Sequence, residues 1–441
     1  MNLQLDHSDL LKTWELMHAR NAALGPARFD FGDIASHPLF LRASRGRWSR
    51  LAVKAMRSPE LLFPITYRQL LGLSKQVVPS LFYHLGLTCC DRERLPAASP
   101  DAVAQTEAAA LAALDLRAEA EHVCWKHPYD HHAAAWRTAS PDDRPPSCAH
   151  HTGRVGLMLL RVGRAHRRAD FVAAGGSAAK ALLEYHNWHA YDDGTYTVSY
   201  YPSSQDEVIN TGADAAVLLA ALEADQREPW MQDRLEGLVR MLVAEQHADG
   251  SWDYCTRRHY QTFGGQRAID NHHSAMNLAA LARILAWDVL EPELGGEVGE
   301  CLEKGLRFYL DAFFTADGSG SYFPGGGRPA CVVGYCEGVS ALCAALSDPR
   351  RLSAGLADQA DRLLPRILAR TIDEFFDPAT GDVACERWFG RRYRIQSARW
   401  GSAPLMQAIT DYLTLTTGRR GEVPVCAPHA GECVLSPAGR R

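Results

Sequence analysis

VINTGADAAVLL, residues 208–219, joins a short polar start to a run of small and apolar residues, and this pattern recurs along the chain. The other copies are AHHTGRVGLMLL (149–160), NHHSAMNLAAL (271–281), GYCEGVSALCAAL (334–346) and SARWGSAPLMQAI (397–409). Their shared small residues are Gly153, Gly212, Ala275, Gly338 and Gly401, at spacings of 59, 63, 63 and 63 residues. A near-constant period of this length predicts a series of repeated supersecondary units.

A second, amphipathic helix is expected after each of the first four apolar runs. These segments are DFVAAGGSAAKALLEYH (170–186), PWMQDRLEGLVRMLVAEQ (229–246), VGECLEKGLRFYLDAFF (298–314) and LADQADRLLPRILARTIDEFF (356–376). Their apolar residues recur every three or four positions with charges between them, which is typical of a helix with one face in water. The apolar runs have no such polar face, so we expect them to form an inner layer enclosed by the charged helices.

A glycine turn followed by aromatic residues ends each of these units. The four copies are DDGTYTVSYYP (192–202), ADGSWDYC (248–255), ADGSGSYFPGG (316–326) and ATGDVACERWF (379–389). A glycine in such a cluster supplies the positive backbone angle of a tight turn, and the following alternation predicts a short hairpin. We expect Trp252 to pack over a helix end and Gly250 to permit the turn.

Upstream of the repeats, residues 67–87 are predicted to be an inner helix and residues 102–122 an outer one, followed by a hairpin-like segment at 127–136. This gives about six helix pairs. Six alternating pairs can close into an all-α (α/α)6 toroid, and closure removes the need for capping repeats. An open α-solenoid is the competing fold.

We expect one toroid domain over residues 1–416 and a flexible tail over residues 417–441. The repeat units are predicted near residues 60–130, 148–205, 208–267, 270–330, 334–395 and 397–416.

Composition excludes several classes of function. The formal net charge of −5 leaves no basic footprint for nucleic acid. No window approaches 18 consecutive apolar residues, so no membrane-spanning helix is expected. Twelve irregularly spaced cysteines and a charged N-terminal segment without a signal-peptide core predict reduced thiols in the cytoplasm.

Two motifs indicate a family resemblance. Gln246, Asp249, Gly250, Ser251 and Trp252 resemble the Gln–acidic–Gly–Ser–Trp motif of squalene and other terpene cyclases. The helix start at residues 269–285 resembles that of the protein prenyltransferase β subunits. Both families have the α/α-toroid fold, and the combination also looks like bacterial single-domain toroid proteins associated with exopolysaccharide biosynthesis. The resemblance covers roughly residues 145–415.

The chain departs from the chemistry of these families. Where class II terpene cyclases carry the aspartic acid that protonates the substrate, this chain has Ile209. Where the prenyltransferases carry Asp-x-Cys zinc ligands, it has Val208 and Asn210. No cofactor is therefore expected, although a different zinc site is conceivable. Its ligands would be His151, His273 and Cys336, which share one register position in three repeats.

If the inner helices start at one mouth of the toroid, their polar first turns line a shared cavity. The positions two before the small residue are His151, Asn210, His273, Cys336 and Arg399. One turn further on, Asp214 and Asn277 add polarity. Capping of helix ends explains any one of these residues alone. Together they form a candidate site of convergent polar groups.

The acid–base candidates are Asp270, His273 and Glu337. His272 and His273 point about 100° apart on a helix, and we expect His273 to face the cavity. The substrate-binding candidates are His151, Asn210, Asp214, Tyr201, Trp252, Tyr260, Asn277 and Arg399.

Tyrosine mixed with His, Asp, Arg and Asn suits a hydroxylated small molecule or oligosaccharide better than a carbocation, which needs a dry apolar pocket. The sequence thus favours a carbohydrate-active or polysaccharide-biosynthesis protein acting by acid–base chemistry, as an epimerase, lyase or hydrolase-like enzyme. One alternative is an isoprenoid-converting enzyme with Asp270 as a non-standard proton donor. Another is a non-catalytic glycan-binding or scaffold protein.

Overall fold

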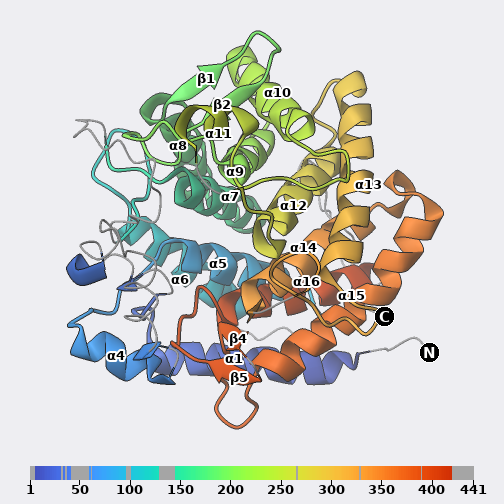
Figure 1. Ribbon diagram of the computed structural model, residues 1–441. Helices are drawn as coiled ribbons and strands as arrows, with labels where there is room; N and C mark the ends of the chain where they lie inside the picture. The colour runs from blue at the N-terminus through green and yellow to red at the C-terminus, as the bar shows by residue number, and fades with distance from the viewer. Residues whose placement is uncertain are drawn as a thin grey trace, which may run out of the picture.

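The computed structural model describes residues 5–30, 33–34, 37–40, 59–60, 62–95, 101–128, 145–264, 267–326, 329–388 and 390–419. Its centre is a ring of helices, here called the inner helices (Figure 1). In order round the ring they are α5 (Ser80–Arg92), α7 (Ala149–His166), α9 (Ile209–Ala220), α12 (Asn271–Trp287), α14 (Val332–Leu346) and α16 (Ser402–Arg419). Each contacts the next and α16 contacts α5, so the ring is closed.

An outer layer of helices surrounds this ring, and each outer helix packs mainly against one inner helix. The pairs are α5 with α6 (Ala102–Asp115), α7 with α8 (Ala169–Tyr185), α9 with α10 (Pro229–Ala244), α12 with α13 (Pro292–Phe313), α14 with α15 (Ala354–Phe375) and α16 with α1 (His7–Leu24). The prediction of an (α/α)6 toroid is confirmed, and the open solenoid is wrong.

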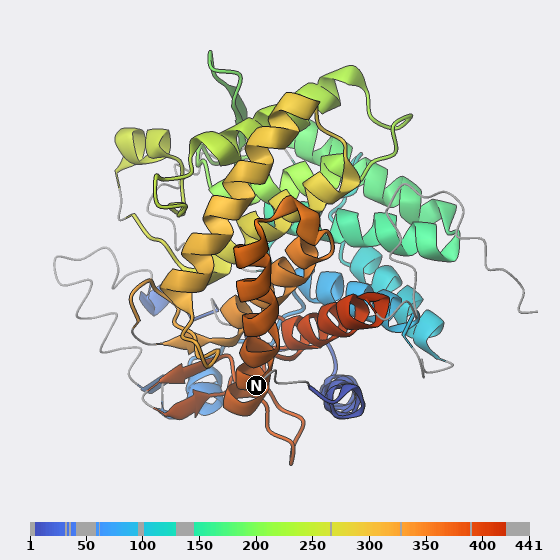
Figure 2. The same ribbon diagram turned by 90° about the vertical axis from the view of Figure 1, so that its right-hand side faces the viewer.

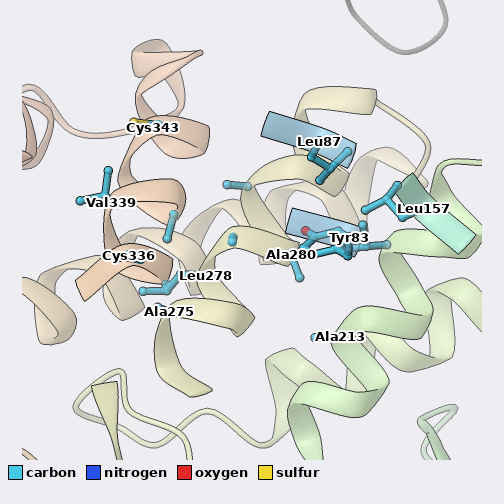
Figure 3. Close-up of a cluster of buried hydrophobic side chains, with 14 of the residues drawn as sticks. Tyr83, Leu87, Leu157, Ala213, Ala275, Leu278, Ala280, Cys336, Val339 and Cys343 are labelled. Atoms are coloured by element: carbon cyan, nitrogen blue, oxygen red, sulfur yellow. The ribbon is translucent and has the colours of Figure 1, made fainter. Parts of the chain in front are cut away.

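The burial of the two layers follows the sequence pattern. In the inner helix α14 every residue from Val332 to Cys343 is buried. In the outer helix α13 the buried residues recur at steps of three and four, and the remaining face lies in water. Figure 3 shows the packed interior, with Leu278 of α12 close to Cys336 and Val339 of α14. The apolar runs therefore form the wall between the central axis and the outer helices.

The repeated small residue makes room for the outer layer. A Cβ atom at Gly338 of α14 would collide with the hydroxyl of Tyr309 on α13. That hydroxyl donates to Asn271 Oδ1 of α12 at 2.6 Å, so it lies between two inner helices. A larger residue at position 338 would displace this tyrosine from the join between neighbouring units.

The glycine turns join each unit to the next outer helix. Gly250 has φ +98°, and a Cβ atom there would collide with the carbonyl oxygen of Lys304 on α13. Gln246 holds this turn, because its Nε2 donates to the carbonyls of Gly250 at 3.1 Å and Cys301 at 2.9 Å. Trp252 Nε1 donates to Leu242 O of α10 at 2.8 Å. The motif that resembles the terpene cyclase signature is thus a structural corner.

Helix α1 closes the outer layer, a role that the sequence analysis did not assign to it. The turn at Gly381 lies against Leu16 and Arg20 of α1, as the turn at Gly250 lies against α13. Arg20 donates to both carboxylate oxygens of Asp382, at 2.7 and 3.1 Å. Figures 1 and 2 show α1 beside the C-terminal helix α16. The unit predicted at 397–416 therefore takes its outer helix from the other end of the domain.

The strands are fewer than predicted. β1 (Trp188–Ala190) pairs with β2 (Tyr196–Val198), and β3 (Ala330–Cys331), β4 (Glu386–Trp388) and β5 (Arg391–Tyr393) form a second antiparallel sheet in that order. The turns at 248–255 and 316–326 carry only single bridges, from Val208 to Cys255 and from Phe314 to Gly320. Hairpins were wrongly expected there, because the chain beyond each turn finds no partner strand of its own.

Short helices complete the described chain: α4 (Pro64–Leu70), α11 (Arg257–Phe263) and the 3-10 turn η2 (Pro349–Arg351). Helix α16 continues to Arg419, past the predicted domain end at 416. Residues 420–441, and most of the hairpin expected at 127–136, lie outside the described residues. No helix among the described residues has both the length and the apolar character that crossing a bilayer needs.

Candidate active site

The N-terminal turns of the inner helices face one mouth of the ring. Side chains from the first two turns of α7, α9 and α14 are hydrogen-bonded to one another, and a further bond joins α5 to α16 at the same level. Helix N-termini carry partial positive charge and exposed N–H groups, so they favour anionic and hydrogen-bonding side chains. The expectation that polar first turns share one mouth is in this respect correct.

An ion pair crosses the axis of the ring. Arg154 Nη1 of α7 donates to Glu337 Oε1 of α14 at 2.7 Å, and its Nε donates to Asp214 Oδ1 of α9 at 3.2 Å. Since α7 and α14 stand three places apart in a ring of six, this pair joins opposite walls. We call Arg154, Asp214 and Glu337 the floor of the site. All three side chains are largely buried.

The charges of the floor stabilise each other. Burial alone would raise the pKa of Glu337, but Arg154 and the nearby His84 and His272 bring it well below its usual value. Burial alone would lower the pKa of Arg154, yet Glu337 and Asp214 raise it. The Glu337 carboxylate and the Arg154 guanidinium therefore stay ionised at neutral pH.

Below the floor the axis is filled. A cavity of about 10 Å³ lies between the floor and Tyr83 and Arg283, which is room for about one water molecule. Arg283 Nη1 of α12 lies 3.4 Å from the Tyr83 hydroxyl of α5, again between opposite walls. Figure 3 shows Tyr83 beside Ala280 of α12 and Leu157 of α7. The interior of the ring is thus packed below the floor.

Two imidazoles from opposite inner helices lie next to the floor. His84 of α5 and His272 of α12 both interact electrostatically with Glu337 and Arg154. Burial lowers the pKa of His84 to about 4, although Glu337 acts in the opposite direction. Burial and the adjacent His273 lower the pKa of His272 well below its usual value. Both rings are therefore neutral at pH 7 and able to accept a proton.

A third buried imidazole, His150 of α7, is paired differently. Its Nδ1 lies 2.7 Å from Asp214 Oδ2, and its ring stacks on Tyr200 with centroids 6.4 Å apart. Burial lowers the pKa of His150 against the effect of Asp214.

Asp270 and His273 form a pair at the rim. Asp270 is the N-cap of α12: its Oδ1 accepts from the His273 backbone N at 2.9 Å, and its Oδ2 lies 2.7 Å from His273 Nδ1. Burial would raise the pKa of Asp270, but His273 brings it below its usual value, so the carboxylate is ionised. The predicted catalytic residues Asp270 and His273 therefore lie together, with His272 between them and Glu337.

The two adjacent histidines lie in different surroundings. The His273 side chain is 26% exposed, with its ring edge-on to Tyr254 at 4.7 Å between centroids. His272 is buried beside the floor and packs against Trp400, with centroids 5.6 Å apart. His272 is thus the histidine next to the floor, and His273, which was expected to face the cavity, lies at the rim.

The other predicted binding residues divide into several groups. His151 is buried next to His150, with ring centroids 5.3 Å apart, and Tyr201 packs on Tyr200 at 4.8 Å. Asn210 Nδ2 lies 3.8 Å from the sulfur of Met276. Asn277 is buried on α12.

Arg399 and Trp400 lie just before α16 and face a segment from the N-terminal part of the chain. Arg399 Nη1 lies 3.5 Å from Asp30 Oδ2, and Trp400 Nε1 donates to Asp30 Oδ1 at 3.2 Å. Asp30 thereby fixes the indole that packs on His272.

Two predicted binding residues, Trp252 and Tyr260, make contacts that hold parts of the fold together. Trp252 is buried between α10 and Gly305 of α13, away from the floor. The Tyr260 hydroxyl accepts from the Cys255 backbone N at 3.3 Å and ties α11 to the preceding turn.

In the described residues, His, Cys, Asp and Glu form no group of three that could hold a metal ion, so the alternative zinc ligands His151, His273 and Cys336 are not assembled. Burial raises the pKa of the Cys336 thiol well above its usual value, which disfavours the thiolate that zinc needs.

The sequence analysis missed His84, Arg154, Trp400 and Gln407. Arg154 directly follows the small residue Gly153, and a charged residue on an otherwise enclosed helix was a usable signal. His84 lies in the divergent first unit, for which no register had been assigned.

Comparison with known proteins supports the fold class. No family model matches the chain, and no curated protein matches it. Among solved structures, a cellobiose 2-epimerase from Bacillus thermoamylovorans has a TM-score of 0.57 at 11% identity, over 76% of this chain and 87% of that one. A D-mannose isomerase has a TM-score of 0.54 at 10% identity, over 77% and 87%.

An alpha-1,6-mannanase of Salegentibacter in complex with alpha-1,6-mannotriose has a TM-score of 0.52 at 9% identity, over 77% of this chain and 91% of that one. At these identities the likeness concerns the fold alone. It places the chain among the α/α toroids, next to proteins named as sugar enzymes rather than as terpene cyclases or prenyltransferases.

Proposed function

We propose that this protein is a carbohydrate epimerase or isomerase that transfers a proton at the carbon next to the carbonyl group of an open-chain sugar. The observation that carries the proposal is the placement of His84 and His272, two neutral imidazoles on opposite walls of the ring, over the Arg154–Glu337 floor. The cellobiose 2-epimerase and D-mannose isomerase among the fold relatives are consistent with it.

The chemistry needs groups that both remove and return a proton. One imidazole takes the proton from C2, and the electron pair moves onto the carbonyl oxygen to give an enediolate. Return of a proton to the opposite face of C2 gives the epimer. When a proton also passes from the O2 hydroxyl to O1, return of a proton to C1 gives the ketose. A general base must be unprotonated at the working pH and lie within hydrogen-bonding reach of the proton that it removes.

The charged groups have supporting roles. The Arg154 guanidinium is the cation nearest to both imidazoles on the floor and would stabilise the enediolate oxygen. Glu337 and Asp214 hold its planar group in place. At the rim, His273 with its ionised partner Asp270 is suited to protonate the ring oxygen as the sugar opens.

Hydrolysis of a glycan is the second candidate, favoured by the mannanase among the fold relatives. A glycosidase needs one carboxyl group with a raised pKa as its general acid. At this mouth the pKa values of Glu337 and Asp270 are both lowered. The same lowering argues against Asp270 as the proton donor of an isoprenoid cyclase. The charge state of the site therefore favours proton transfer over glycoside cleavage.

Hydrogen exchange in heavy water tests the proposal. The protein is incubated in ²H₂O with cellobiose, D-mannose, D-glucose and N-acetylated hexosamines, and the ¹H NMR signal of H2 is followed. An epimerase or isomerase replaces this hydrogen with deuterium even where little product accumulates. His84→Asn and His272→Asn should abolish the exchange.

The matched control is His122→Asn, which removes an imidazole paired with Glu184 at the outer layer. This variant should exchange like the wild type. Absence of exchange across the panel, together with release of reducing ends from an alpha-1,6-mannan, would move the assignment to the hydrolase.

A further inference from the structure

His84 has a neutral hydrogen-bond partner on the neighbouring helix. Gln407 lies in the second turn of α16, and its Oε1 is 2.6 Å from His84 Nδ1. Both side chains are buried, with 5% of each residue exposed. The contact crosses the boundary between α5 and α16, where the ring closes.

This contact determines which nitrogen of His84 carries the proton. An amide oxygen accepts hydrogen bonds and cannot donate them. Nδ1 must therefore be the N–H nitrogen, and the lone pair of the neutral ring is on Nε2. The proton-accepting atom is thus the one directed away from Gln407.

Charged groups surround His84 from the other walls of the ring. Glu337 of α14 favours the protonated ring, whereas Arg154 of α7 and Arg399 before α16 oppose it. On its own helix the ring is edge-on to Tyr83, with centroids 5.0 Å apart. A carboxylate in place of Gln407 would add a second negative charge and favour the imidazolium, as Asp214 does for His150.

We propose that Gln407 is a positioning residue that holds His84 in the Nδ1–H tautomer and keeps Nε2 available as a general base. The inference rests on the proposed function for its catalytic meaning, but the tautomer itself is independent of any substrate. A neutral acceptor suits a base that must be unprotonated at neutral pH, since it orients the ring without stabilising the cation.

The first test needs no activity. In the wild-type protein labelled with ¹⁵N-histidine, long-range ¹H–¹⁵N correlations report the tautomer of each ring, and the signals of His84 are those that disappear in His84→Asn. We expect Nδ1 to appear as a protonated, pyrrole-type nitrogen and Nε2 as a pyridine-type nitrogen. The reverse assignment in the wild type overturns the proposal, whether or not any variant folds.

The second test compares two replacements. Gln407→Met keeps the length of the side chain and removes the acceptor, whereas Gln407→Glu keeps an acceptor and adds a charge. Gln407→Met should mix the His84 tautomers and lower kcat for H2 exchange by about tenfold or more, toward the ~10²–10⁴-fold that a general base contributes, with KM little changed.

Gln407→Glu should keep the tautomer and move the acid limb of the kcat–pH profile to higher pH. If Gln407 had only a structural role, both variants would have lower melting temperatures and the kcat–pH profile would not shift. This result would overturn the inference. If the wild type exchanges no sugar while His84 shows the expected tautomer, the proposed function fails and the role of Gln407 in setting the tautomer stands.

Discussion

Arg154 and Glu337 are bonded at 2.7 Å although they belong to helices on opposite sides of the ring. The bond spans the central axis just above a cavity that has room for about one water molecule. Because it joins opposite walls, this ion pair fixes the charged groups of the floor next to the two imidazoles.

Removing one partner of this pair should be strongly destabilising. Arg154→Met leaves the Glu337 carboxylate buried without its cation, which costs about 3–5 kcal/mol. Glu337→Gln leaves Arg154 paired with Asp214 alone and should cost less. The double variant Arg154→Met/Glu337→Gln should lose less stability than the two single variants together, yet show no H2 exchange. Urea unfolding of the four proteins measures the coupling. Additive losses would show that the pair contributes no interaction of its own.

The stability of the protein should depend on the titration of His84. This group has a pKa of about 4 in the folded protein and about 6.5 in the unfolded chain. Its contribution is fully present above about pH 6.5 and is lost as the pH falls toward 4, because protons then bind preferentially to the unfolded state. When the pH falls from about 6.5 to about 4, the free energy of unfolding of the wild type should drop by up to roughly 3 kcal/mol more than that of His84→Asn.

Denaturant unfolding at several pH values between about 4 and 7 provides the comparison. Asp33 and Asp411, whose pKa values burial raises to about 6, give stability that is lost in the opposite direction, as the pH rises. They are present in both proteins, so they cancel in the difference. If the free energy of unfolding depended on pH in the same way in the wild type and in His84→Asn, His84 would not be a buried neutral ring.

Because the turn at Gly381 packs against α1, where the ring closes, substitution of this glycine should be destabilising. Gly381 has φ +72°, and a Cβ atom there would lie 2.8 Å from the carbonyl oxygen of Leu16 on α1. Gly72 has nearly the same φ, +71°, and open space around it. Gly72→Ala should cost only the backbone strain of about 1–2 kcal/mol, and Gly381→Ala should cost clearly more. Equal losses in melting temperature would mean that the turn does not press on α1.

Trp252 should matter for stability and not for the reaction. Its indole is buried and bonded to Leu242 O, so Trp252→Ala should cost about 3–5 kcal/mol. The folded fraction of this variant should exchange H2 at the wild-type rate per molecule. A change in KM at unchanged folded fraction would return Trp252 to the list of substrate-binding residues.

The variant Asp270→Asn distinguishes the role of Asp270 as the N-cap of α12 from the effect of its negative charge on His273. Asparagine caps helices about as well as aspartate, so the free energy of unfolding should change by less than about 1 kcal/mol. The variant removes the ionised partner of His273 and should slow turnover of cyclic sugars. Turnover equal to the wild type would limit Asp270 to its role as the N-cap of α12.

The sequence predicted those features that depend on repetition. The alternation of enclosed and amphipathic helices, the turns at Gly250 and Gly381, and the gathering of polar first turns all follow from one period of about 63 residues. The role of α1 could not be predicted in this way, because it belongs to a unit split between the two ends of the domain. Local periodicity holds no information about which helix completes a ring.

The part of the site that the sequence did not predict depends on the length and direction of individual side chains. The alignment of the repeats placed His151 and His273 at equivalent positions. The axis is instead occupied by Arg154, which directly follows the aligned glycine of its unit. Its side chain is long enough to reach Glu337 across the ring. The position of His272 next to the floor depends on the exact rotation of α12, which a pattern of apolar residues fixes only coarsely. Asp30 reaches Trp400 from a segment that has no counterpart in the other units.

The pairing of α1 with α16 has a consequence for synthesis of the protein. The hydrogen bond between His7 and Thr416 joins residues 409 positions apart, so this part of the fold forms only after nearly the whole domain has left the ribosome. Contacts of such long sequence separation are slow to form. The bond between His84 and Gln407 crosses the same junction between early and late helices. A nascent chain should therefore acquire its helices progressively but its activity all at once, at the final docking step.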